Sequence, residues 1–162
     1  MSQGSDLEAL AARTSLVDAV TAYALALDLR DWPAYRALFE DEIEIDYASL
    51  GSIRAILPAQ AWIDRCKVLG GFDATRHEVS GFQIALSDQT ARVTSRIHAA
   101  HVIGAHSAFV RGTYVHEFRR HDAAWKIHAC TLTVEDYPGG GRAAFDEAFN
   151  AARAAHAAGT AR

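Results

Sequence analysis

The sequence predicts an α+β fold in which helices come first and a mainly antiparallel sheet follows. Apolar residues recur at helical spacing in three segments of the first half, and turn residues separate these segments. Between residues 74 and 135 the chain shows four long runs that are typical of strands and are joined by short turns. No helix between these runs is long enough for a parallel crossover, so we expect a curved four-stranded meander.

The helices are expected at residues 6–29, 31–39 and 59–69. The first has a clear apolar stripe, and either Ser5 or Asp6 suits its N-cap. Asp31 fits the cap of the second helix, and Pro33 fits its first turn. Pro58 precedes the third helix, which a pair of glycines ends.

The strands are predicted where the spacing of apolar residues changes from helical to alternating. In residues 42–47 apolar and polar side chains alternate. This pattern predicts an early strand that joins the sheet and has one solvent-exposed face. The four runs of the meander are expected at residues 74–86, 90–104, 108–120 and 124–135.

The C-terminal segment is expected to lie outside this domain. Residues 138–141, Pro-Gly-Gly-Gly, predict a flexible break, and the Ala-rich residues 142–157 predict a peripheral helix. We therefore expect one domain over residues 1–137 and a flexible tail over residues 138–162.

Length and composition narrow the class of protein. The 162 residues suffice for one hydrophobic core, and a formal net charge of −4 lacks the basic excess that nucleic-acid binding needs. We see neither a secretion signal nor an apolar stretch long enough to span a bilayer, so we expect a cytoplasmic protein without a membrane partner. Cys66 and Cys130 are then expected to be free thiols, and they alone make no zinc site.

Asp28 is a carboxylate on the apolar face of the first predicted helix. It lies four residues after Ala24, eight after Val20 and eleven after Val17, so helical spacing places it on their stripe. Such a carboxylate costs free energy unless it is paired, and His77 is a partner that would allow acid–base chemistry. The plainer interpretations are that Asp28 caps the following turn and that His77 is an exposed strand residue.

The expected strand over residues 90–104 carries two histidines on opposite faces. Its more apolar face, which should point inward, consists of Val93, Ser95, Ile97, Ala99 and His101. His98 points the other way, so the two histidines cannot easily bind one ion, and we expect no metal site. His101 is then either an acid or polarising group in a pocket or an ordinary part of its lining.

Several segments resemble one known family. YALALDLRDW at residues 23–32, LFEDEIEIDY at 38–47, TRH at 75–77 and GTYVHEFRRHDAAWKI at 112–127 resemble the SnoaL-like branch of the nuclear transport factor 2-like superfamily. The match runs over roughly residues 8–135. Within this branch the chain resembles scytalone dehydratase and hexachlorocyclohexane dehydrochlorinase.

The resemblance implies a cone-shaped sheet wrapped around the helices, with a deep apolar pocket. In the two named enzymes an aspartate of the first helix orients a histidine base, and Asp28 and His77 match these positions. Tyr47 matches a pocket tyrosine of scytalone dehydratase. A second tyrosine of that enzyme stands where this chain has Leu27, and Tyr23 lies one turn earlier.

The resemblance adds further pocket residues. Tyr114 matches a lining position, Cys130 of the last strand is expected to line the pocket as well, and His101 stands about two residues from a second histidine of scytalone dehydratase. Relatives form dimers or trimers through the outer face of the sheet, so we expect a homo-oligomer, with a trimer favoured.

These observations together predict a cofactor-free lyase. His77, aligned by Asp28, would remove a proton from a small to medium apolar substrate, aromatic or polyketide-like, and a β-leaving group would depart. A ketosteroid-isomerase-type isomerase or a cyclase is one alternative, because it uses the same parts. A non-catalytic ligand-binding module, or one like the small subunit of a ring-hydroxylating dioxygenase, is another.

Overall fold

The structure is a computed structural model that describes residues 3–159. Its helices are α1 Gln3–Leu29, α2 Trp32–Ala37, α3 Ala59–Cys66 and α4 Gly141–Ala157, with short 3-10 turns η1 Ala48–Leu50 and η2 Lys67–Gly71. Its strands are β1 Phe39–Asp46, β2 Arg54–Pro58, β3 Ala74–Leu86, β4 Thr90–Ile103, β5 His106–His121 and β6 Ala124–Asp136. The predicted α+β class is confirmed.

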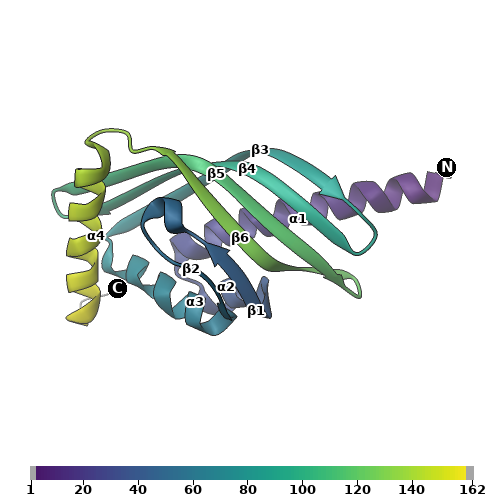
Figure 1. The fold of residues 1–162 in the computed structure, drawn as a ribbon, viewed down its shortest axis with the longest axis horizontal. Coiled ribbons are helices and arrows are strands. Elements are labelled where there is room, and N and C mark those ends of the chain that lie inside the picture. The colour runs from purple at the N-terminus through teal and green to yellow at the C-terminus, as the bar shows by residue number, and fades with distance from the viewer. Residues whose placement is uncertain (1–2, 160–162) are drawn as a thin grey trace.

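The strands form one mixed sheet in the order β2-β1-β6-β5-β4-β3. The long strands β3 to β6 make the expected antiparallel meander, and β1 joins it through a parallel pairing with β6. The sheet curves over α1, while α2 and α3 lie below it and α4 stands across one end (Figure 1). This arrangement agrees with the cone that the family resemblance implies.

Two local predictions were incomplete. The hairpin partner of β1, Arg54–Pro58, was not predicted, because only five residues alternate weakly between two turns. The helix expected over 59–69 ends at Cys66, and the chain continues as the tighter η2 turn up to Gly71.

The inner face of the sheet packs against one stripe of α1. Leu16, Val20, Tyr23 and Leu27 are buried there, at the spacing that the sequence shows. The alternation predicted for β4 is confirmed, because its inward set from Val93 to His101 is buried while the intervening residues face outward. The N-terminal turns of α1 extend past the strands (Figure 1).

By length and composition alone, α1 could also cross a membrane. Residues Asp6–Leu29 have a mean hydropathy of 1.3, which differs from the expectation that no such stretch exists. The core helix of a water-soluble protein meets the same criterion, and one stripe of α1 packs under the sheet. This helix is therefore weak evidence for a membrane span.

The helix expected over 142–157 forms, but it is not peripheral. Phe145, Ala148 and Ala152 of α4 are buried and belong to the same core as the sheet. The burial follows from spacing, because these residues lie three or four positions apart and so share one face of the helix. Where the domain ends in sequence stays a prediction.

A glycine permits α4 to pack this closely. A Cβ atom on Gly71 would lie 2.0 Å from the backbone oxygen of Ala152, well inside van der Waals contact. Since the neighbouring atom is backbone, a side chain could enter only if α4 moved away from η2. Gly71 therefore sets the distance between the C-terminal helix and the rest of the fold.

We expect Gly71→Ala to lower the free energy of unfolding by about 3 kcal/mol, the upper part of the usual range for overpacking. Urea denaturation followed by circular dichroism measures the change. Gly104→Ala is the control, because Gly104 has a positive φ of 54° but no atom near its Cβ position, which limits its cost to about 1 kcal/mol. Equal losses in the two variants would contradict the close-approach argument.

Candidate active site

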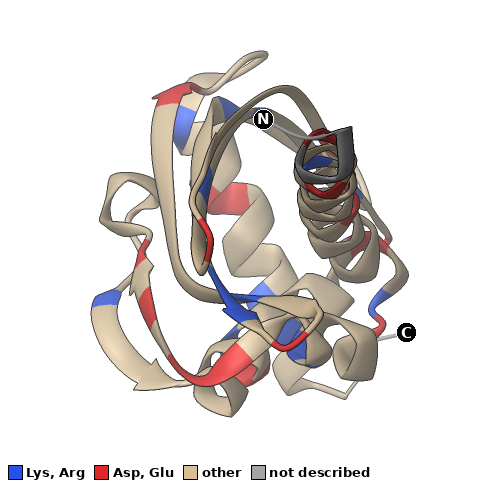
Figure 2. Cartoon of the chain, turned by 90° about the vertical axis from the view of Figure 1, so that its right-hand side faces the viewer, with Lys and Arg blue, Asp and Glu red and all other residues tan. Residues whose placement is uncertain are grey.

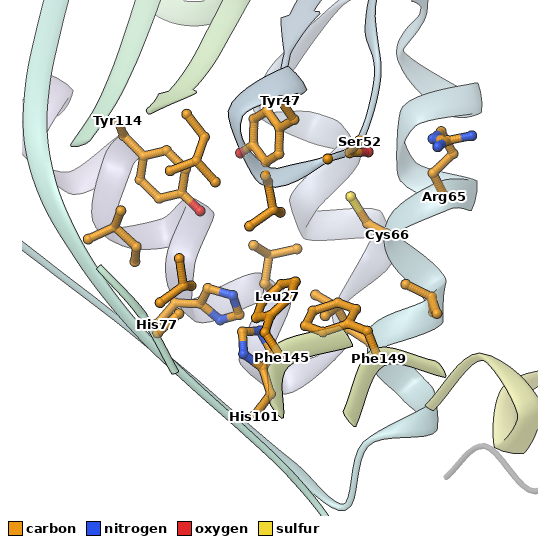
Figure 3. Close-up of a pocket in the computed structure, with 18 of the residues that line it drawn as sticks. Leu27, Tyr47, Ser52, Arg65, Cys66, His77, His101, Tyr114, Phe145 and Phe149 are labelled. Carbon is orange, nitrogen blue, oxygen red and sulfur yellow. The ribbon is translucent and has the colours of Figure 1, made fainter. Parts of the chain in front are cut away.

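A cavity of about 380 Å³ lies between the inner face of the sheet, α1, α3 and α4. Its lining is largely apolar and aromatic, and includes Leu27, Tyr35, Trp62, Leu69, Val110 and Phe149. Five of the residues predicted for the site contribute to this lining: Tyr23, Tyr47, His77, His101 and Tyr114. The sequence-predicted residues therefore converge on one apolar cavity (Figure 3).

Asp28 and His77 form a hydrogen-bonded pair at the edge of this cavity. The ring Nδ1 of His77 lies 2.6 Å from Oδ1 of Asp28. The same carboxylate accepts the backbone N–H of His77 at 2.8 Å and the hydroxyl of Thr75 at 3.1 Å. Because a carboxylate only accepts, the bonded nitrogen is the donor, and in a neutral imidazole the other ring nitrogen is an acceptor. The His77 ring lines the cavity, whereas Asp28 is not among the lining residues.

The position of Asp28 is unfavourable for an isolated helix. It lies in the last turn of α1, which has no basic residue, at the negative end of the helix dipole. Burial also raises the pKa of this carboxyl, but the hydrogen bonds and the charge of His77, together with the bond from Thr75, outweigh burial and lower the pKa below 3.8. Asp28 is therefore an anion that its neighbours on β3 stabilise.

Arg30 holds the end of α1 in place. It follows the helix in the left-handed region, with a φ of 56°. Its guanidinium donates to the carbonyl of Phe72 at 2.8 Å, to that of Leu69 at 3.2 Å and to that of Asp28 at 3.1 Å. These bonds tie the C-terminal end of α1 to the segment that leads into β3, and so bring Asp28 to His77.

His101 is a second histidine in the cavity. Its ring packs edge-on against that of His77 at 5.2 Å between centroids, and it also contacts Phe72 and Phe149. Burial, helped by the charge of His77, lowers the pKa of His101 to about 3. Its Nδ1 atom is buried without a hydrogen-bond partner among the described residues. His101 is therefore neutral at physiological pH.

Two tyrosine hydroxyls meet on the other side of the cavity. The hydroxyl of Tyr23 lies 2.5 Å from that of Tyr47. Tyr23, one turn before Leu27, therefore places a second tyrosine hydroxyl next to Tyr47. Burial raises the pKa of both phenols well above 10, and it raises that of Tyr114 as well. All three hydroxyls stay protonated and can donate hydrogen bonds within an apolar space.

Cys130 does not line the cavity, contrary to prediction. It is buried behind the tyrosine pair, with its sulfur 3.6 Å from the hydroxyl of Tyr47 and 3.8 Å from that of Tyr23. Burial raises the pKa of its thiol to about 12, so the thiolate is disfavoured. Cys66 takes a lining place instead. Cys130 is buried as part of the core, but the tyrosine hydroxyls lie against its sulfur.

Sequence reasoning missed the residues that α4 and α3 bring to the cavity. Phe145 and Phe149 lie over His101, and Trp62 contacts Tyr47 at 4.8 Å between ring centroids. Their helical spacing was visible, but nothing local indicated which surface they would cover. Among residues 3–159, no three His, Cys, Asp or Glu side chains lie together in a way that could hold a metal ion.

The comparisons with known proteins identify the family of this chain. The family model of the SnoaL-like domain matches residues 8–131, which is most of the chain. The chain belongs to the SnoaL-like family. No curated protein sequence matches it.

Solved structures share the fold at low sequence identity. The Kfla4162 protein from Kribbella flavida is 21% identical, with a TM-score of 0.77 over 90% of this chain and 99% of that one. A candidate scytalone dehydratase from Novosphingobium aromaticivorans is 23% identical, with a TM-score of 0.72 over 79% and 87%. A type 2 hexachlorocyclohexane dehydrochlorinase is 18% identical, with a TM-score of 0.72 over 83% and 94%. At these identities the likeness establishes the fold alone.

The lowered pKa of Asp28 predicts how stability depends on pH. Because the folded pKa lies below the unfolded value of 3.8, the contribution of Asp28 is fully present above that pH and is lost as the pH falls through the folded pKa. Asp28→Asn should therefore unfold about 1–3 kcal/mol more easily at pH 7, the usual worth of hydrogen bonds to a charged group, and the difference should shrink in acid.

Urea unfolding of both proteins between pH 7 and pH 2 measures this difference. Asp18→Asn is the matched control, because Asp18 is an exposed carboxylate on the same helix. A difference between wild type and Asp28→Asn that stays constant down to the lowest pH would contradict the stabilised anion.

Proposed function

We propose that this protein is a cofactor-free lyase that eliminates a small leaving group from an apolar substrate. The observation that carries the proposal is the 2.6 Å contact between Asp28 and His77 at the edge of an apolar cavity. A carboxylate that fixes the tautomer of an imidazole and stabilises its cation turns the histidine into an effective base. The small water content expected of such a cavity would favour proton transfer to His77.

The elimination divides into a proton transfer and a departure. The unbonded ring nitrogen of His77 takes a proton from the carbon next to an activating group, such as a carbonyl. The electron pair of that C–H bond becomes the new C=C bond as the β-substituent leaves with its own bonding pair. Asp28 stabilises the imidazolium, which then returns the proton to the leaving group or to water.

The tyrosines supply hydrogen bonds to the oxygen or halogen on which charge builds up. Since the phenols are protonated, each can donate without first gaining a proton. One hydroxyl of the Tyr23–Tyr47 pair donates its proton to the oxygen of the other. The accepting hydroxyl keeps its own proton free to donate to the substrate, and the bond that it accepts polarises its O–H group. His101, being neutral, can donate or accept but cannot supply a positive charge.

The cavity limits the class of substrate. A volume of about 380 Å³ lies near the lower end for small-molecule sites, which suits a molecule of one or two rings. Aromatic rings from Tyr47, Trp62 and Phe149 suit a flat, apolar body. The likeness to a candidate scytalone dehydratase and to a hexachlorocyclohexane dehydrochlorinase supports elimination as the type of reaction.

An isomerase is the second candidate, because His77 could return its proton to a different carbon. A pure binding module, or one like the small subunit of a dioxygenase, accounts less well for an anion held against an inward-facing imidazole next to an open cavity. The homo-oligomer, with a trimer favoured over a dimer, stays a prediction.

The proposal predicts turnover of 3-hydroxy-1-tetralone, a two-ring β-hydroxyketone that loses water to give fluorescent 1-naphthol. His77→Ala should lower kcat/KM by about 10²- to 10⁴-fold, the usual contribution of general base catalysis. Asp28→Asn should lower it as well, because the imidazole loses its fixed tautomer. Stopped-flow or steady-state fluorescence measures the rates.

His98→Ala is the control, because His98 is exposed on the opposite face of β4. Exchange of the α-protons of 2-tetralone with deuterated water, followed by NMR, separates the two candidates. Proton exchange in 2-tetralone, together with no naphthol formed from 3-hydroxy-1-tetralone, would favour the isomerase. If wild type did neither, or if His77→Ala kept the wild-type rate, the base assignment would be wrong.

The tyrosine pair predicts a second, non-additive result. Tyr47→Phe and Tyr23→Phe should each lower kcat by about tenfold, while the double variant should lose little more, because the two hydroxyls act as one hydrogen-bonded unit. Steady-state kinetics with the same tetralone gives the three values. Fully multiplicative losses would show that each hydroxyl acts independently of the other.

A further inference from the structure

The mouth of the cavity differs in character from its interior. Four charged side chains contribute to the lining, and all come from the two helices that border the mouth: Arg65 from α3, and Arg142, Asp146 and Arg153 from α4. Arg65, Arg142 and Arg153 are exposed, so these charges are solvated at the rim. In Figure 3, Arg65 lies at the edge of the lining side chains, on the side away from His77.

One of these arginines has a structural role. Arg142 donates to Asp146 at 2.8 Å and to the hydroxyl of Tyr137 at 3.0 Å. Its guanidinium also lies against Gly51, where a Cβ atom would be 2.5 Å from it. Arg142 therefore links α4 to the turn after η1, and Asp146 compensates its charge.

The other two arginines have no acidic partner within residues 3–159. Among the described residues, no hydrogen bond or ion pair engages the guanidinium of Arg65. The adjacent carboxylate of Asp64 is held by Lys67 at 2.7 Å instead. Arg153 donates only to the neutral amide of Asn150, at 2.7 Å. Two uncompensated cations therefore border the cavity.

This excess is local. The whole chain has a formal net charge of −4, which by itself disfavours anions. Basic and acidic residues both occur along its strands and helices (Figure 2). Asp146, the one carboxylate among the described residues that line the cavity, is already paired. A positive mouth above an apolar interior matches a molecule that is apolar at one end and anionic at the other.

We propose that the substrate carries a carboxylate that binds between Arg65 and Arg153 while its apolar rings fill the cavity toward His77. A guanidinium offers two parallel N–H donors that match the two oxygens of a carboxylate. Only the claim that His77 acts on the buried end rests on the proposed function. The binding of the anionic end depends only on the arginines at the mouth.

Direct binding tests this inference without a known reaction. Isothermal titration calorimetry compares 2-naphthoate with its neutral methyl ester at low salt. Wild type should bind the acid about tenfold more tightly, since solvated ion pairs each contribute modestly. The double variant Arg65→Gln/Arg153→Gln should lose this preference and keep its affinity for the ester. Raising the salt concentration should weaken binding of the acid only.

Two controls separate this result from that of the proposed function. Arg54→Gln, on β2 and paired with Asp46, should keep the preference, because Arg54 does not line the cavity. His77→Ala should also keep it, even if that variant is inactive in the tetralone assay. Equal affinities for acid and ester in wild type, no binding of either compound, or a preference that survives in the double variant would overturn the proposal.

Discussion

The bond between Asp28 and His77 is the constraint on which the rest of the site depends. A carboxylate at the end of a helix and partly out of water is unfavourable, and here three donors from the first residues of β3 compensate it. The same bonds join the end of α1 to the sheet, and Arg30 reinforces that junction through carbonyls on both sides. The geometry of the candidate site and the packing of the first helix against the sheet therefore depend on the same hydrogen bonds.

Burial acts in opposite senses on the groups around this pair. It raises the pKa of the phenols of Tyr23 and Tyr47 and lowers that of His101, so each of these groups takes its neutral form. Asp28 alone keeps its charge, because hydrogen bonds outweigh desolvation. An apolar cavity with one carboxylate-bound imidazole and several neutral donors suits proton transfer, since charge develops at one defined place.

The two ends of the chain complete the cavity together. The first helix supplies Tyr23 and Leu27 to the lining, while the last helix covers His101 with aromatic rings and brings arginines to the mouth. The close approach of Gly71 to the backbone of Ala152 makes this possible. Substrate specificity is therefore expected to depend on α4, a segment that lies beyond the matched family domain at residues 8–131.

The sequence alone determined the class of fold, the meander, the inward face of β4 and the candidates Asp28 and His77. These predictions follow from the spacing of apolar and polar residues along the chain, which is a local pattern, and from a family resemblance. The tertiary structure alone decided that Tyr23 meets Tyr47, that Cys130 is covered, that α4 closes the cavity and that Arg65 and Arg153 border its mouth. These contacts join residues distant in sequence, and packing between elements sets them, which no local pattern encodes.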